Sequence, residues 1–96
     1  MIIQIDARTG VTILDPDDFK RFEATLSGDV APAASLLRDK VEIDGAPQHV
    51  WVLESWLREA LGAGRAAALD AMIRYAESKG WRRASPPAIR AHIAPG

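Results

Sequence analysis

Polar and apolar residues alternate in four short segments, as they do in strands that bury one face. The apolar positions of this alternation are Ile3 and Ile5, Val11 and Ile13, Val41 and Ile43, and Val50 and Val52. Gly10 ends the first connection, and Gly45, Ala46 and Pro47 occupy the second, as expected for turns. The pattern therefore predicts two β-hairpins, which we expect to join in one small antiparallel sheet.

Helical periodicity appears first between the two hairpins. Asp15 is a suitable N-cap, Pro16 suits the first helical position, and Phe19, Phe22 and Leu26 recur at spacings of three and four. These signals predict a helix over residues 16–27. Residues 29–39 fit either a short helix or a packed loop.

The last part of the chain predicts three more helices, over residues 53–61, 66–79 and 86–93. Leu69, Met72, Ile73 and Ala76 form the apolar stripe of the middle one. Ser85-Pro86-Pro87 is typical of a helix start, and Ile89 and Ile93 would lie on one face of the last helix. The expected fold is a single α+β domain over residues 1–96, in which two hairpins form an antiparallel sheet packed by one helix from the N-terminal half and three C-terminal helices.

Composition supports an ordinary globular domain. The 96 residues are 48% hydrophobic and 26% charged, which is sufficient for one modest core. The absence of cysteine excludes disulfides and thiolate chemistry. We find no apolar run long enough for a membrane span and no signal peptide, so we expect a cytoplasmic protein.

Charge is unevenly distributed although the net charge is only −1. Residues 1–64 carry a balance of −5, and residues 65–96 carry a balance of +4. The candidates for a basic patch are Arg74, Lys79, Arg82, Arg83 and Arg90. On the predicted helices they resemble a helix-turn-helix, but its turn would be long and the rest of the domain is acidic, so DNA binding is disfavoured.

Motifs for metal and cofactor chemistry are not found. A calcium-binding loop that starts at Asp15 would need glycine and glutamate where Lys20 and Leu26 stand. Gly62-Ala63-Gly64 follows a predicted helix and lacks the third glycine of a dinucleotide loop. The two histidines have no partners at the spacing of a zinc site. We therefore expect no metal, no cofactor and no assembled catalytic group.

The second predicted hairpin offers a candidate surface. If Val50 and Val52 face the core, Trp51 and His49 face the opposite side of the sheet, beside Glu42. Such a mixture of aromatic and polar residues is typical of interfaces and ligand clefts. Arg90 and His92 could add to a pocket from the terminal helix, where a separation of two residues would place them on different faces.

These observations favour a small non-enzymatic binding or protein-interaction module, expected to be a homodimer or to bind another protein. The first alternative is a ligand-binding or enzymatic domain with a pocket near His49 and Trp51, lined also by Glu42 and Arg90. The second is DNA binding through the basic segment Arg82–Arg90.

Overall fold

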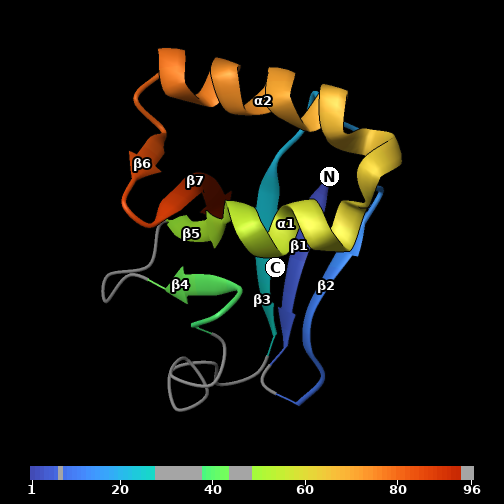
Figure 1. Cartoon of the computed structure of the whole chain (residues 1–96). Coiled ribbons are helices and arrows are strands. Elements are labelled where there is room, and N and C mark those ends of the chain that lie inside the picture. The colour runs from blue at the N-terminus through green and yellow to red at the C-terminus, as the bar shows by residue number, and fades with distance from the viewer. Residues whose placement is uncertain (7, 28–37, 44–48, 94–96) are drawn as a thin grey trace.

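The computed structural model describes residues 1–6, 8–27, 38–43 and 49–93, and for His49 it describes the backbone alone. Within them the chain forms seven strands, two α-helices and one short 3-10 helix (Figure 1). The strands are β1 (Ile2–Asp6), β2 (Gly10–Leu14), β3 (Glu23–Ser27), β4 (Val41–Ile43), β5 (His49–Leu53), β6 (Arg82–Ala84) and β7 (Pro87–Ile93). The helices are α1 (Glu54–Leu61), η2 (Ala63–Arg65) and α2 (Ala66–Ser78).

The seven strands belong to one mixed sheet in the order β2-β1-β3-β7-β5-β4. β3 runs parallel to both β1 and β7, whereas the other neighbours are antiparallel. β6 lies outside this order and pairs with the first half of β7. Strand β7 therefore has β5 along one edge and shares its other edge between β6 and β3.

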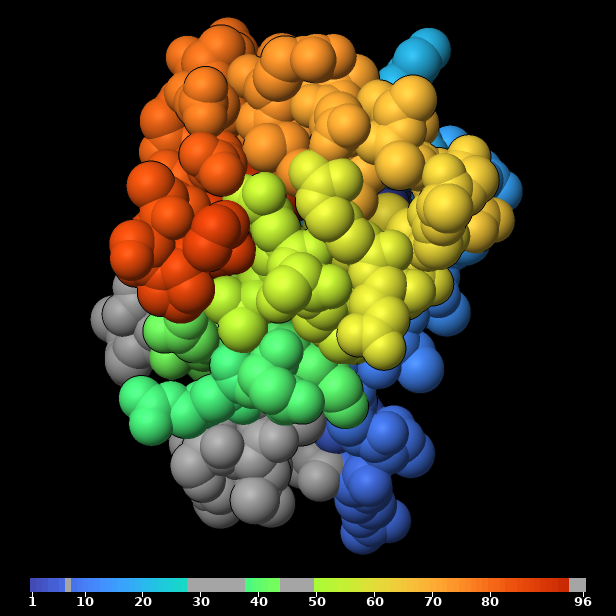
Figure 2. Space-filling model, in the orientation of Figure 1, coloured from blue at the N-terminus to red at the C-terminus, as the bar shows by residue number. Residues whose placement is uncertain are grey.

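One face of the sheet and the inner faces of both helices form a single core. α1 packs against β5 and β7, and α2 packs against β6 and β7. Figure 2 shows the two helices covering much of the face turned to the viewer. The largest fully buried side chains are Met1, Ile3, Ile5, Val41, Val50, Val52, Leu57, Leu69 and Ile89. Neither α-helix in the described part of the chain is both long and apolar enough to cross a membrane.

Both predicted hairpins are confirmed. In the first, Ile3 lies opposite Ile13 and Ile5 lies opposite Val11. Gly10 has φ of +91°, a conformation that glycine adopts at little cost. In the second, β4 and β5 pair so that Val41 faces Val52 and Ile43 faces Val50. The turn between them, residues 44–48, lies outside the described residues, as does most of the uncertain segment 29–39.

The helix predicted over residues 16–27 is wrong. The Asp18 N–H donates to the Asp15 carbonyl at 3.0 Å, which closes a turn, and Glu23–Ser27 is the strand β3. Asp-Pro is common both in turns and at helix starts, so the local signal supports either structure. Pairing with β1 and β7 decides between them, because it buries Ala24 completely in the sheet.

Two of the three C-terminal helices are confirmed, as α1 and α2, and the inward residues of α2 are the four predicted. The third, over residues 86–93, is wrong, because residues 87–93 form the central strand β7. Ile89 and Ile93 are four positions apart, a spacing that places residues on one side of either a helix or a strand. The mixture of helices and strands is as expected, but the fold is a curled mixed sheet covered by two helices. The predicted antiparallel sheet packed by four helices is wrong.

Candidate functional site

A row of four residues crosses the sheet on the face away from the α-helical core. Glu42 lies opposite Trp51, and Trp51 lies opposite Arg90. The β6–β7 register extends to Trp81, whose carbonyl accepts from the Arg90 N–H at 2.8 Å. Opposed residues in adjacent antiparallel strands share one face. Glu42, Trp51, Arg90 and Trp81 therefore follow one another across β4, β5, β7 and the residue before β6.

Arg90 and His92 share this face, which corrects the prediction that they lie on different faces of a helix. They stand two residues apart on β7, and side chains at that spacing point to the same side of a strand. His92 is opposite both His49 on β5 and Glu23 on β3. The side chain of His49 lies outside the described residues, so only its backbone position can be stated.

Arg83 contacts two residues of the row, Trp51 and Glu42. Its guanidinium lies 5.4 Å from the centre of the Trp51 ring and pairs with the Glu42 carboxylate. The hydrogen bond from Arg83 lowers the pKa of Glu42, against the opposing effect of partial burial. A guanidinium over an aromatic face is attracted by the electron-rich ring. Arg83 is thus held between an aromatic ring and a carboxylate, and it covers part of Trp51.

Beyond Trp81 the same series of aromatic and cationic groups continues onto α2. The rings of Tyr75 and Trp81 meet edge to face with their centres 6.1 Å apart, and the Lys79 Nζ lies 5.7 Å from the centre of the Tyr75 ring. Tyr75 is 58% exposed and Trp81 is 36% exposed. We call this series the aromatic–cationic strip; its members are Lys79, Tyr75, Trp81, Arg90, Trp51 and Arg83.

A cleft of about 780 Å³ opens beside the strip. It lies where β6 and β3 meet the same edge of β7, because β6 pairs with residues 87–89 and β3 pairs only with residues 92–93. The segments that lead into β6 and β3 separate at this point and leave the cleft between them. The lining residues are Phe19, Lys20, Arg21, Phe22, Glu23, Met72, Tyr75, Ala76, Trp81, Ile89, Arg90 and His92.

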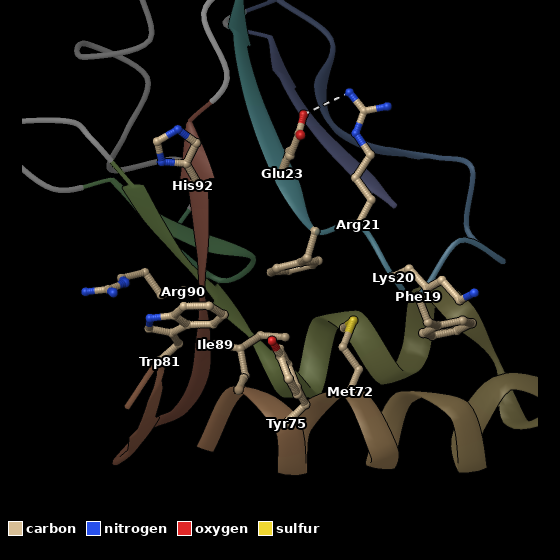
Figure 3. Close-up of a pocket in the computed structure, with 12 residues that line it drawn as sticks. Phe19, Lys20, Arg21, Glu23, Met72, Tyr75, Trp81, Ile89, Arg90 and His92 are labelled. Carbon is tan, nitrogen blue, oxygen red and sulfur yellow. Dashed lines mark hydrogen bonds and ion pairs between the residues drawn. The ribbon is translucent and has the colours of Figure 1, made fainter. Parts of the chain in front are cut away.

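Apolar and aromatic side chains make up the floor and much of the walls of the cleft. Met72 and Ile89 are nearly inaccessible to solvent. Figure 3 shows Met72 and Tyr75 rising from α2, with Trp81 on one side and Phe19 on the other. Pockets of this size and composition bind small organic groups in many proteins. The cleft can therefore accept a flat apolar ring.

The segment that carries Phe19 and Phe22 is held at several points. The Met1 amino group donates to the carbonyls of Asp18 and Arg21 at 2.5 and 2.6 Å. Arg65, just before α2, pairs with Asp17 at 2.7 Å and lowers the pKa of that carboxyl. These contacts fix one wall of the cleft relative to the sheet and to α2.

Cations surround the mouth of the cleft. Arg21 pairs with Glu23 at 3.0 Å and lowers the pKa of that carboxyl. Lys20 and Arg90 have no carboxylate within ion-pair distance among the residues that the structure describes. Figure 3 shows the Arg90 guanidinium directed outward past Trp81, not into the cleft. The opening is therefore cationic although the floor is apolar.

The residues of the predicted basic patch do not lie on one surface, because Arg82 and Arg83 point to opposite faces of β6. Arg82 faces the helices, where it pairs with the buried Glu54 at 2.9 Å and with Glu77 at 3.1 Å. Arg83 points to the other face and pairs with Glu42. Because residues 82–84 and 87–93 are strands, the proposed helix-turn-helix geometry is wrong. Of the five candidates, Lys79, Arg83 and Arg90 belong to the strip, and Arg74 is exposed on α2.

The prediction of a pocket between the sheet and a terminal helix is also wrong, because the residues expected to form that helix form the strand β7. Arg90 and His92 line the observed cleft, whereas Glu42 and Trp51 lie farther along the row. The sequence interpretation missed Tyr75, and it placed Phe19 and Phe22 on the apolar stripe of a helix; both pack against the core, but from the segment before β3. The available signal was a tyrosine outside the apolar stripe of the helix predicted over residues 66–79.

Among the described residues, no group of three or more His, Cys, Asp or Glu side chains could hold a metal ion. No protein-family model, curated protein or solved structure matches the chain.

Proposed function

We propose that the protein is a non-enzymatic binding module whose ligand inserts a flat apolar or aromatic group into the cleft. The observation that carries this proposal is the pair of exposed rings, Tyr75 and Trp81, at the mouth of a cleft with an apolar floor. Exposed aromatic groups that adjoin a concave apolar surface mark binding sites more often than isolated exposed residues do. The well-anchored wall means that little ordering is needed when a ligand binds.

An uncharged aromatic dye, N-phenyl-1-naphthylamine, tests this proposal because its fluorescence rises in apolar surroundings. We expect saturable binding to the folded protein and weaker binding to Trp81→Ala and Tyr75→Ala. Arg8→Met, a change in the exposed β1–β2 turn, is the control and should bind the dye normally. Circular dichroism would verify that each variant is folded. Absence of saturable binding, or equal affinity in all the variants, would overturn the proposal.

Self-association is the second part of the proposal, and the edge strand β2 supports it. Among the described residues β2 pairs with β1 alone, and Val11–Leu14 carries no charge that would discourage another strand from pairing. Leu14 is 43% exposed. Light scattering should detect a dimer that Thr12→Lys dissociates, because lysine on an edge strand opposes pairing. A strict monomer at high micromolar concentration would contradict self-association.

A further inference from the structure

We infer that the aromatic–cationic strip binds single-stranded nucleic acid, with bases stacked on Tyr75 and Trp81 and phosphates held by Arg90 and Lys79. This inference rests on the proposed function, because Tyr75, Trp81 and Arg90 belong to both the strip and the cleft.

The rings provide the stacking surfaces. Tyr75 and Trp81 are both substantially exposed, and their edge-to-face contact holds them at an angle of 71°. Two rings at such an angle cannot both lie against one continuous stack of bases. They can receive separate bases, one of which can enter the adjacent cleft over Met72 and Ile89. Aromatic side chains bind single strands in this way, with little dependence on base identity.

Local charge favours a polyanion although the whole chain has a net charge of −1. The strip and the cleft mouth together carry Lys20, Arg21, Lys79, Arg83 and Arg90 against Glu23 and Glu42, a balance of +3. Trp51 and Trp81 flank Arg90 on neighbouring strands, which places their backbones about 10 Å apart. Arg90 thus lies between the two tryptophans, where it could meet the phosphate next to a base stacked on Trp81. A cation lies beside each of the two exposed rings, Lys79 at Tyr75 and Arg90 at Trp81, as phosphates that flank two stacked bases would require.

A single strand fits this surface better than a duplex does. In a duplex the bases are stacked on one another and unavailable to Tyr75 and Trp81 until they are unpaired. Direct reading of duplex DNA usually requires an element that enters a groove, and the strip is instead a row across a sheet and the end of a helix. An acidic peptide would satisfy the cations but would not need the two rings, so aromatic variants distinguish the two kinds of partner.

The test is fluorescence anisotropy with labelled oligothymidylate and oligouridylate of about 12 nucleotides, a length within the range of known single-strand sites. We expect binding that weakens from about 50 to about 200 mM salt. Trp81→Ala and Tyr75→Ala should each weaken binding about 5- to 150-fold, and Trp81→Phe should retain most of the affinity. Comparison of the two oligomers shows whether DNA or RNA is preferred.

A matched pair of arginine variants isolates the phosphate contact. Arg90→Met should weaken binding and reduce the magnitude of the logarithmic salt slope by about 0.7, the value for one phosphate contact on a single strand. Arg8→Met removes the same charge from the connection between β1 and β2, outside the strip and the lining of the cleft, and should leave the slope unchanged.

Several outcomes would overturn the inference. One is the absence of oligonucleotide binding when N-phenyl-1-naphthylamine still binds, which leaves the proposed function intact. Another is equal affinity for polyglutamate and oligothymidylate with no effect of Trp81→Ala, which indicates a general anion surface. Tighter binding of duplex than of single strands would also refute it. Failure of both the dye and the oligonucleotides would refute the proposed function as well.

Discussion

Replacement of Ile89 by alanine tests the central position of β7, which the sequence pattern assigned to a terminal helix. Ile89 is 1% exposed, lies opposite Val52 on β5 and Arg82 on β6, and forms part of the cleft floor. Alanine removes three carbons, each worth about 0.8 kcal/mol of burial, or about 2.4 kcal/mol in all. The space created joins the open cleft, so we expect only a small additional cavity cost and a total near 3 kcal/mol.

Urea unfolding followed by circular dichroism measures this loss, and an unchanged m-value would show that the unfolding transition is comparable. For a domain of 96 residues, a loss of about 3 kcal/mol lowers Tm by about 12–24 °C. Ile89→Val keeps the branched side chain and should cost only about 1 kcal/mol. Leu57→Ala removes as many carbons from a fully buried position on α1 that does not line the cleft, and should cost about 3–5 kcal/mol. A loss below about 1 kcal/mol for Ile89→Ala would refute the reasoning, because such a value is typical of a half-exposed aliphatic residue.

Three further predictions concern the ion pair, a turn and the covered ring. Arg83 lowers the pKa of Glu42 below its ordinary value of 4.5, so the folded state binds that proton less readily than the unfolded state. The ion pair therefore stabilises the folded state above pH 4.5, and this contribution is lost as the pH falls through the lower pKa of the folded state. Glu42→Gln should reduce the dependence of Tm on pH in this range. An unchanged dependence would contradict the prediction. Gly62→Ala should lower the free energy of unfolding in urea by about 1–3 kcal/mol, because Gly62 has φ of +80° and ψ of +169°. Gly64→Ala is the control and should not destabilise the protein, since no positive φ is required there. Equal effects of the two changes would refute the backbone argument. A double-mutant cycle on Trp51→Leu and Arg83→Met should give a coupling free energy of about 0.5–1 kcal/mol, and additive losses would show that their stacking contributes nothing.

The elements predicted correctly are those whose signals are local. The two hairpins combine alternation with a nearby turn, and α2 has a stripe of four buried residues over about two turns, a pattern that a strand cannot produce. β3 and β7 depend instead on partners far along the chain. In β7 the spacing of Ile89 and Ile93 suits both kinds of structure, and only pairing with β5 and β6 selects the strand.

The same distinction between local and distant contacts applies to the candidate site. Glu42 and Trp51 could be placed on one face because they belong to one hairpin. Arg90 joins them only through the β5–β7 register, and the cleft requires residues 19–23 to lie opposite α2. Neither relation leaves a periodic pattern in the sequence. Tyr75 gains its role from Trp81, whose ring reaches it only after the chain has turned at Gly80, where φ is +77°.

The pairing between β3 and β7 is short, and it is the connection between two parts of the sheet. Two residue pairs, Glu23 with His92 and Ala24 with Ile93, connect the part that contains β1, β2 and β3 to the part that contains β4, β5, β6 and β7. The cleft lies along this seam, since Glu23 of β3 and Arg90 and His92 of β7 line it. Amide hydrogens at the seam should exchange faster than those in the middle of β1 and β5. A ligand bound in the cleft would contact β3 and β7 together and should therefore slow that exchange.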